Sequence, residues 1–161
     1  MSREVKFRAW HEDLEVMVYS DKRNKSTYDI DYEFAINEKG TLVCNWYEDT
    51  EDAYGNFREA SGTLDNLMQY TGFEDTKNKE IYEGDILHVT KVSMCGVDKY
   101  NVAEYNTDVK WEDGAFVIKG DADVECYDTW LAAYNNPDSP QIEIEVIGNI
   151  YENPELLRSE E

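Results

Sequence analysis

Apolar and polar residues alternate along this chain in short runs, which is the pattern of half-buried β-strands rather than of helices. The clearest run covers residues 141–151, where Ile142, Ile144 and Val146 share one face and acidic side chains occupy the other. Shorter runs of the same kind, separated by turns, fill most of the remaining chain. The pattern predicts a mainly β protein whose strands are joined as hairpins.

Turn residues between the runs place several of these hairpins. Asp113-Gly114 is typical of a type I′ hairpin turn, which needs positive φ angles. Gly84-Asp85 precedes a β-type run, so the glycine is expected to bend the chain while the aspartate accepts backbone N–H groups. Gly148 interrupts the last strand and marks a kink or a close approach of another backbone segment.

A few stretches lack the alternation and are interpreted differently. Residues 48–62 and 93–99 are expected to form loops. A short helix is predicted over residues 61–67, and another over residues 128–134 with Asp128 as its N-cap. We therefore expect one or two short helices in a mainly β fold.

The net charge of the chain restricts the classes of partner that it can bind. Its net charge is −21, from 36 acidic and 15 basic side chains in 161 residues. Binding to nucleic-acid phosphates or to anionic membranes needs clustered Lys and Arg, so both are disfavoured. The simplest interpretation of the charge is solubility, and the alternative is a surface that binds a basic partner or mimics nucleic acid. Because the chain also lacks a signal peptide and a long apolar run, we expect a cytoplasmic protein.

Side chains that often carry catalysis are few and dispersed. Cys44, Cys95 and Cys126 are odd in number and far apart, so we interpret them as reduced thiols. His11 is expected in a surface turn, whereas His88 lies within a predicted strand and is expected to be half-buried and hydrogen-bonded. No nucleophile motif or glycine-rich phosphate loop accompanies them, so the sequence predicts neither an enzyme nor a cofactor.

The acidic residues give no specific metal motif. Residues 121–125 alternate in the manner of a calcium loop but lack its central glycine and its distal glutamate at the proper spacing. We therefore predict a solvated loop there and no metal site. A carboxylate pair suited to hydrolysis stays open, because so many acidic side chains always provide candidates.

Four segments occur in an order that resembles the YopX family of phage and prophage proteins. They are VKFRAW at residues 5–10, LMQYTGFEDTKNKEIYEGDIL at residues 67–87, VKW with a nearby Phe at residues 109–116, and IEVIGNIYENPELL at residues 144–157. The resemblance implies a phage origin, an N-terminal β-rich region and a C-terminal SH3-like β-barrel. We accordingly expect the β-rich region over residues 1–75, the barrel over residues 76–157 and an acidic tail over residues 158–161.

The resemblance carries no catalytic residue with it, so aromatic side chains are the remaining functional candidates. Tyr70, Tyr82, Trp111 and Phe116 are predicted to gather at the barrel, either as packing or as a binding surface. We expect a noncatalytic accessory protein that binds a host or phage protein in the bacterial cytoplasm, with homo-oligomerisation through strand edges as a further expectation. The alternative is a nucleic-acid-associated protein, or a metal-dependent one that processes nucleotides or nucleic acid.

Overall fold

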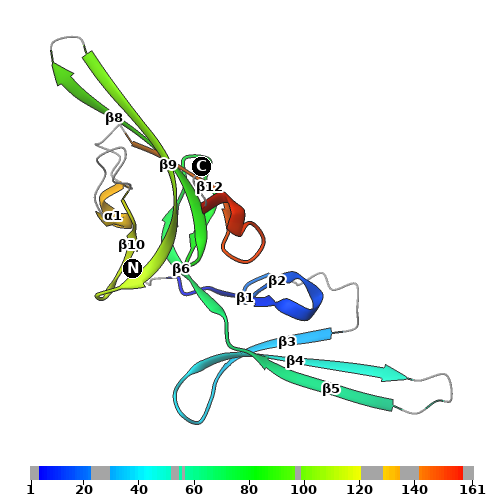
Figure 1. The fold of residues 1–161 in the computed structure, drawn as a ribbon. Coiled ribbons are helices and arrows are strands. Elements are labelled where there is room, and N and C mark those ends of the chain that lie inside the picture. The colour runs from blue at the N-terminus through cyan, green and yellow to red at the C-terminus, as the bar shows by residue number, and fades with distance from the viewer. Residues whose placement is uncertain are drawn as a thin grey trace. The chain divides into compact units, whose positions relative to one another are not determined.

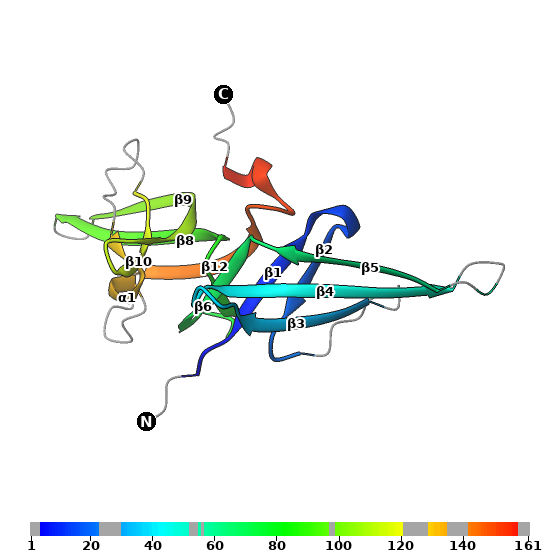
Figure 2. The same ribbon diagram turned by 90° about the horizontal axis from the view of Figure 1, so that it is seen from below.

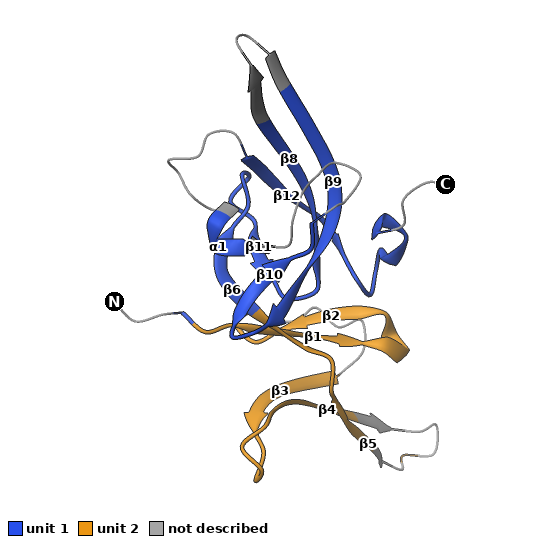
Figure 3. Cartoon of the chain, turned by 60° about the vertical axis from the view of Figure 1, so that its left-hand side comes forward, with its two compact units in different colours: residues 1–4, 70–161 blue, residues 5–69 orange. Residues whose placement is uncertain are grey.

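The computed structural model describes residues 4–22, 30–51, 55, 57–96, 99–120, 129–134 and 142–157. These residues confirm the mainly β class, with their strands in three antiparallel sheets. The chain divides into two compact units, which Figure 3 colours separately: unit 1 holds residues 1–4 and 70–161, and unit 2 holds residues 5–69. Each unit has its own buried apolar cluster, so each is described by itself.

The described residues of unit 2 are mainly β-strands. They are β1 (Phe7–His11), β2 (Val16–Tyr19), β3 (Ile30–Ile36), β4 (Leu42–Glu51), β5 (Phe57–Leu64) and the first part of β6 (Leu67–Glu74), with the 3-10 helix η1 (Glu12–Leu14) after β1. Strand β1 pairs with both β2 and β6. Strands β3, β4 and β5 lie side by side as an antiparallel sheet (Figure 2).

Two sequence-based expectations for unit 2 are wrong. The predicted loop over residues 48–62 is largely a hairpin, because β4 pairs with β5 from Cys44↔Leu64 to Glu51↔Phe57. The predicted helix over residues 61–67 is absent for the same reason, since its first residues belong to β5. Strand pairing thus overrides the weak local preference of this acidic segment.

An aromatic–glycine pair explains part of this hairpin. Trp46 and Gly62 are direct cross-strand partners. A Cβ atom built on Gly62 would lie 2.6 Å from the Trp46 Nε1 atom, so only glycine lets the indole lie across the neighbouring strand. The ring packs onto a cluster that includes the buried side chains of Ala9, Val18 and Cys44.

Unit 1 contains the remaining elements. They are the second part of β6, then β7 (Glu80–Tyr82), β8 (Asp85–Gly96), β9 (Lys99–Glu112), β10 (Ala115–Ile118), β11 (Thr129–Trp130), the helix α1 (Leu131–Tyr134), β12 (Ile142–Asn149) and the 3-10 helix η2 (Pro154–Leu157). Five strands form one sheet in the order β11-β10-β9-β8-β12. Strand β12, which comes last of the five along the chain, therefore pairs with β8, which comes first. The sheet curves into a half-barrel, with β8 and β9 as one long hairpin (Figure 1). The loop expected over residues 93–99 is therefore wrong, because both strands extend into it.

The turns of unit 1 follow their sequence signals. Asp113 and Gly114 have φ angles of 50° and 82°, which confirms the predicted turn with two positive φ angles between β9 and β10. Gly84 has a φ of 76° before β8, and the Asp85 carboxylate accepts the Tyr82 N–H at 2.7 Å, as expected. The predicted kink at Gly148 is a shift in the pairing of β12 with β8.

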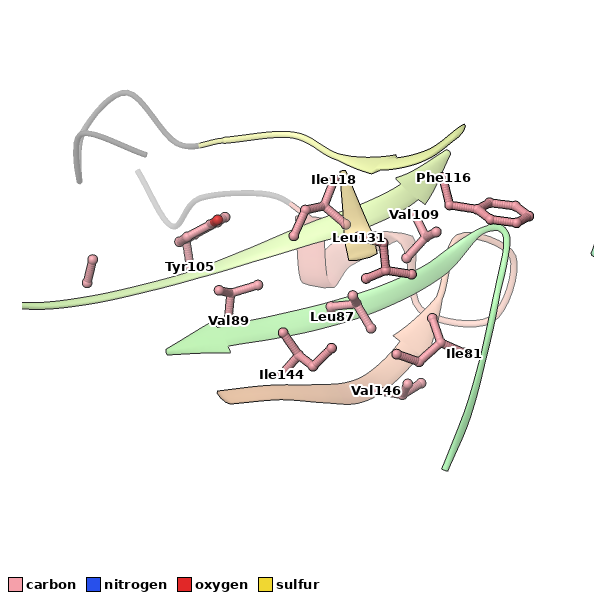
Figure 4. Close-up of a cluster of buried hydrophobic side chains, with 11 residues drawn as sticks. Ile81, Leu87, Val89, Tyr105, Val109, Phe116, Ile118, Leu131, Ile144 and Val146 are labelled. Atoms are coloured by element: carbon pink, nitrogen blue, oxygen red, sulfur yellow. The ribbon is translucent and has the colours of Figure 1, made fainter. Parts of the chain in front are cut away.

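The core of unit 1 lies on the concave face of this sheet. Figure 4 shows side chains from several strands and from α1 pointing toward one another. Those that are fully buried are Ile81, Leu87, Val89, Val109, Ile118 and Leu131. Burying one such side chain contributes about 1.5–3 kcal/mol, so this cluster is the main support of the unit.

Helices are a minor component of the fold. The helix predicted over residues 128–134 is present but shorter, because it begins at Leu131 and the preceding Trp130 belongs to β11. The proposed N-cap, Asp128, lies outside the described residues. Within the described part of the chain, no helix has the length and apolar character needed to cross a membrane.

Candidate functional site

Tyr70 and Tyr82 form one of two aromatic pairs among the predicted site residues. They are direct cross-strand partners on β6 and β7, with ring centroids 5.5 Å apart. Both are buried, and the Tyr82 hydroxyl donates a hydrogen bond to the Glu80 carboxylate at 3.0 Å. Their position is that of packing side chains, which was one of the two interpretations of the aromatic residues.

Trp111 and Phe116 form the second pair, across the β9–β10 hairpin. Their ring centroids are 4.8 Å apart and their planes meet at 69°, which is a favourable edge-to-face arrangement. Phe116 is 6% exposed and belongs to the core, whereas Trp111 is 51% exposed. The indole therefore rests on a buried ring and presents much of its surface to solvent.

Trp111 and Phe116 line a recess in unit 1 with a volume of about 420 Å³, which we call the aromatic recess. Its wall also includes Phe73 of β6, Trp130 of β11 and Ala132 of α1. Trp130 is 66% exposed. The structure thus brings two of the four predicted residues to this recess, together with Phe73 and Trp130, which the sequence did not single out.

Two glycines with positive φ angles form part of the wall of the aromatic recess. Gly72 and Gly114 both line it, and both have positive φ angles, of 88° and 82°. A Cβ atom added to either would meet no atom of the described residues within 4 Å. The Thr71 hydroxyl donates to the Ile81 carbonyl at 2.7 Å and accepts the Phe73 N–H at 3.2 Å, which fixes the bulged end of β6.

A second hollow, of about 340 Å³, lies in unit 2 beside His11. The expected surface position of His11 is wrong, because this residue pairs with Val16 at the end of β1 and is 3% exposed. Its Nδ1 atom is 2.8 Å from the Tyr32 hydroxyl, and its ring lies 5.2 Å from that of Trp46. Burial lowers the pKa of His11, although the nearby Asp13 carboxylate acts in the opposite direction.

Other candidate groups for chemistry are engaged or shielded. His88 is half-buried on β8 with its Nδ1 atom 2.9 Å from the Asn106 Oδ1 atom, which confirms its expected role. Burial raises the pKa of the Cys44 thiol to about 11, so the nucleophilic thiolate is scarce at neutral pH. In the described part of the chain, no group of three or more His, Cys, Asp or Glu side chains is placed to hold a metal ion. The acidic stretch 121–125 and Cys126 lie outside the described residues.

Comparison with known proteins identifies the family but gives no activity. A family model described as YopX protein matches residues 6–158. The crystal structure of protein EF1440 from Enterococcus faecalis is similar, with a TM-score of 0.51 and 24% sequence identity, over 98% of this chain and 100% of that chain. This level of identity supports a shared fold alone. No curated protein sequence matches. Because the family model covers nearly the whole chain, the protein belongs to the YopX family.

Proposed function

We propose that this YopX-family protein is a noncatalytic interaction module that binds another protein through the aromatic recess. The observation that carries the proposal is the pair of exposed tryptophans, Trp111 and Trp130, that line a recess of about 420 Å³. Tryptophan is enriched at the energetic centres of protein interfaces, where a pocket and a buried anchor meet. Exposed apolar side chains that gather in this way mark an interaction site more often than isolated ones do.

The chemistry of the recess supports binding rather than catalysis. Its wall consists of aromatic residues, alanines, glycines and a single hydroxyl, that of Thr71. This hydroxyl already donates to the Ile81 carbonyl. A general acid or base must lie within hydrogen-bond reach of a reacting group, and the described residues of this wall supply none. The alternative of metal-dependent nucleotide or nucleic-acid processing gains no support from such a surface.

The wider context of the proposal comes from the family. We infer that the protein is encoded by a phage or prophage and acts in the cytoplasm of the bacterial host, with a host or phage protein as its partner. We also infer that the sheet of unit 1 belongs to an SH3-like barrel. Support for this fold comes from its strand order, in which the fifth strand pairs with the first and a short helix precedes the fifth. In such small barrels, exposed aromatic side chains commonly form the binding surface.

The test is affinity capture from a host lysate with matched variants. Wild-type protein and Val102→Ala should retain the same partner, because Val102 is an exposed apolar residue of β9 that does not line the recess. The double variant Trp111→Ala/Trp130→Ala should lose that partner while staying folded, with a melting temperature lowered only by the loss of the Trp111–Phe116 contact. Equal capture by the double variant would refute the role of the recess. Capture of nothing beyond what an equally acidic unrelated protein retains would refute the interaction function itself.

A further inference from the structure

We propose that the aromatic recess receives an arginine side chain from a basic, extended segment of the partner. This inference rests on the proposed function and names the chemistry of what that site binds.

The two tryptophans provide surfaces on which a guanidinium group can stack. Trp111 contacts Phe116 in an edge-to-face manner, and about half of its surface stays accessible. Trp130 is still more exposed. A planar cation over an indole face is attracted by the ring quadrupole, and arginine stacks in this way better than lysine. The recess therefore favours a flat cationic group over a purely aliphatic one.

The rest of the recess suits the aliphatic stem of the same side chain. Phe73 and Ala132 line it with apolar surface, on which the methylene groups of arginine can pack while the charged end stays near solvent. A volume of about 420 Å³ lies within the range of roughly 300–1,000 Å³ that is usual for sites that take a discrete ligand group. Gly72 and Gly114 carry no side chain, so an extended segment can approach the wall closely at these two positions.

Charge complementarity selects a basic partner. Among the residues that the structure describes, no lysine or arginine lines the recess, and the chain neighbours of two lining residues, Glu74 and Asp113, are exposed acids. The nearby Lys110 is paired with the Asp108 carboxylate at 2.9 Å. A second copy of this chain would bring another net charge of −21, so self-docking at this rim is repelled, whereas a basic segment is attracted.

The experiment uses the full chain labelled with ¹⁵N at its tryptophans, so that the indole N–H signals report on each site. The probe is a short synthetic peptide in which arginine alternates with serine, with lysine and glutamate versions as controls. The arginine peptide should shift the signals of Trp111 and Trp130 and leave those of Trp10 and Trp46 in place. It should bind about two- to fivefold more tightly than the lysine peptide, as expected when cation–π stacking adds to charge.

Variants separate stacking from simple charge attraction. Trp130→Ala should abolish most of the preference for arginine, and because this side chain is largely exposed, its loss should leave the fold intact. Asp113→Asn should weaken both basic peptides, whereas Glu155→Gln, an exposed acid on η2, should change neither. Val102→Ala should bind both peptides as the wild type does.

Other results would overturn the inference. Equal affinity for arginine and lysine peptides would show that charge alone is involved. Shifts at all four tryptophans, or at none, would show that the recess is not the site. The arginine peptide could fail to bind while Trp111→Ala/Trp130→Ala still loses its partner from the lysate. That result would refute the arginine inference and would support the proposed interaction function.

Discussion

Asp75 provides a sharp test of how unit 1 is held together. This buried residue follows β6, and its carboxylate accepts three backbone N–H groups: Oδ1 accepts those of Lys77 and Lys79 at 2.8 and 2.9 Å, and Oδ2 accepts that of Val146 at 3.0 Å. The first two contacts shape the turn before β7, and the third ties that turn to β12. A single side chain therefore joins segments about seventy positions apart.

The expected cost of removing this carboxylate follows from its partners. A hydrogen bond to a charged acceptor contributes about 1.5–3 kcal/mol to stability. In Asp75→Ala the N–H groups of the exposed turn can bind water, but the Val146 N–H lies in a buried strand and loses its partner. We therefore expect the free energy of unfolding to fall by about 3–4 kcal/mol. Glu74→Ala, an exposed neighbour, should change it by less than about 0.5 kcal/mol.

The pH dependence of this effect gives an independent check. Burial would raise the pKa of the Asp75 carboxyl, but the N–H groups of Val146, Lys79 and Lys77, together with the Lys79 ammonium, lower it below its ordinary value. The ionised Asp75 carboxylate should thus contribute fully to the free energy of unfolding at a pH above 3.8, the ordinary pKa of this group. This contribution should be lost as the pH falls through the lower pKa that the group has in the folded protein.

Urea unfolding of wild type, Asp75→Ala and Glu74→Ala at several pH values measures both expectations, and hydrogen exchange locates the change. The amide of Val146 should exchange faster in Asp75→Ala, because its acceptor is gone. Equal stability of the two variants would refute the assigned role of the carboxylate. A difference between wild type and Asp75→Ala that persists unchanged below the folded pKa would refute its electrostatic basis.

Three further predictions concern single positions. Gly84→Val should lower the free energy of unfolding by about 2–3 kcal/mol, because a β-branched residue is strained at a φ of 76°. Gly40→Val has the same φ in an exposed turn and should therefore show a similar loss, and an unchanged melting temperature in Gly84→Val would contradict the idea. Gly148→Ala should lower the free energy of unfolding by about 1–3 kcal/mol, because the new Cβ atom would lie 2.6 Å from the Oδ1 atom and 2.9 Å from the Cβ atom of Asn153. A urea midpoint equal to that of the wild type would show that Asn153 moves freely. Burial lowers the pKa of His11, so the free energy of unfolding should fall as the pH drops below the ordinary value of 6.5. His11→Asn should flatten this pH dependence in urea titrations, and an unchanged slope would assign the pH dependence to other groups.

Local signals in the sequence predicted the turns well. The positive φ angles that a turn requires restrict which residues can occupy it, so Asp113-Gly114 and Gly84-Asp85 identify their own conformations. The alternation around Ile144 and Val146 likewise predicted β12, because one face of this strand is buried in the core. In each case the physical constraint lies within a few neighbouring residues.

Long hairpins were missed for the opposite reason. The segment from Glu48 to Gly62 is acidic and has few apolar residues, so it lacks the alternation that marks a half-buried strand. Its strand conformation comes from backbone pairing that continues outward from the Cys44↔Leu64 end of the hairpin. This pairing depends on register between strands rather than on local composition, and so the sequence pattern favoured a loop.

The positions of the candidate site residues were only partly predictable. The pairing of Trp111 with Phe116 follows from the hairpin turn between them. Phe73 and Trp130 reach the same recess from β6 and β11, and no local pattern connects segments so distant in the sequence. His11 is a similar case, because Tyr32 and Trp46, which contact it, come from strands 21 and 35 positions later.

In the aromatic recess, the side chain that belongs to the core of unit 1 differs from the side chains that we propose to bind a partner. Phe116 lies in the core, whereas the two tryptophans near it are at least half exposed. The wall formed by β6 is fixed by the hydrogen bonds of Thr71, so little of it needs to become ordered when a partner arrives. A preorganised wall reduces the entropic cost of association, which favours recognition by a small number of anchors. Removing an exposed indole should therefore weaken binding far more than folding, and this difference makes the tryptophan variants informative.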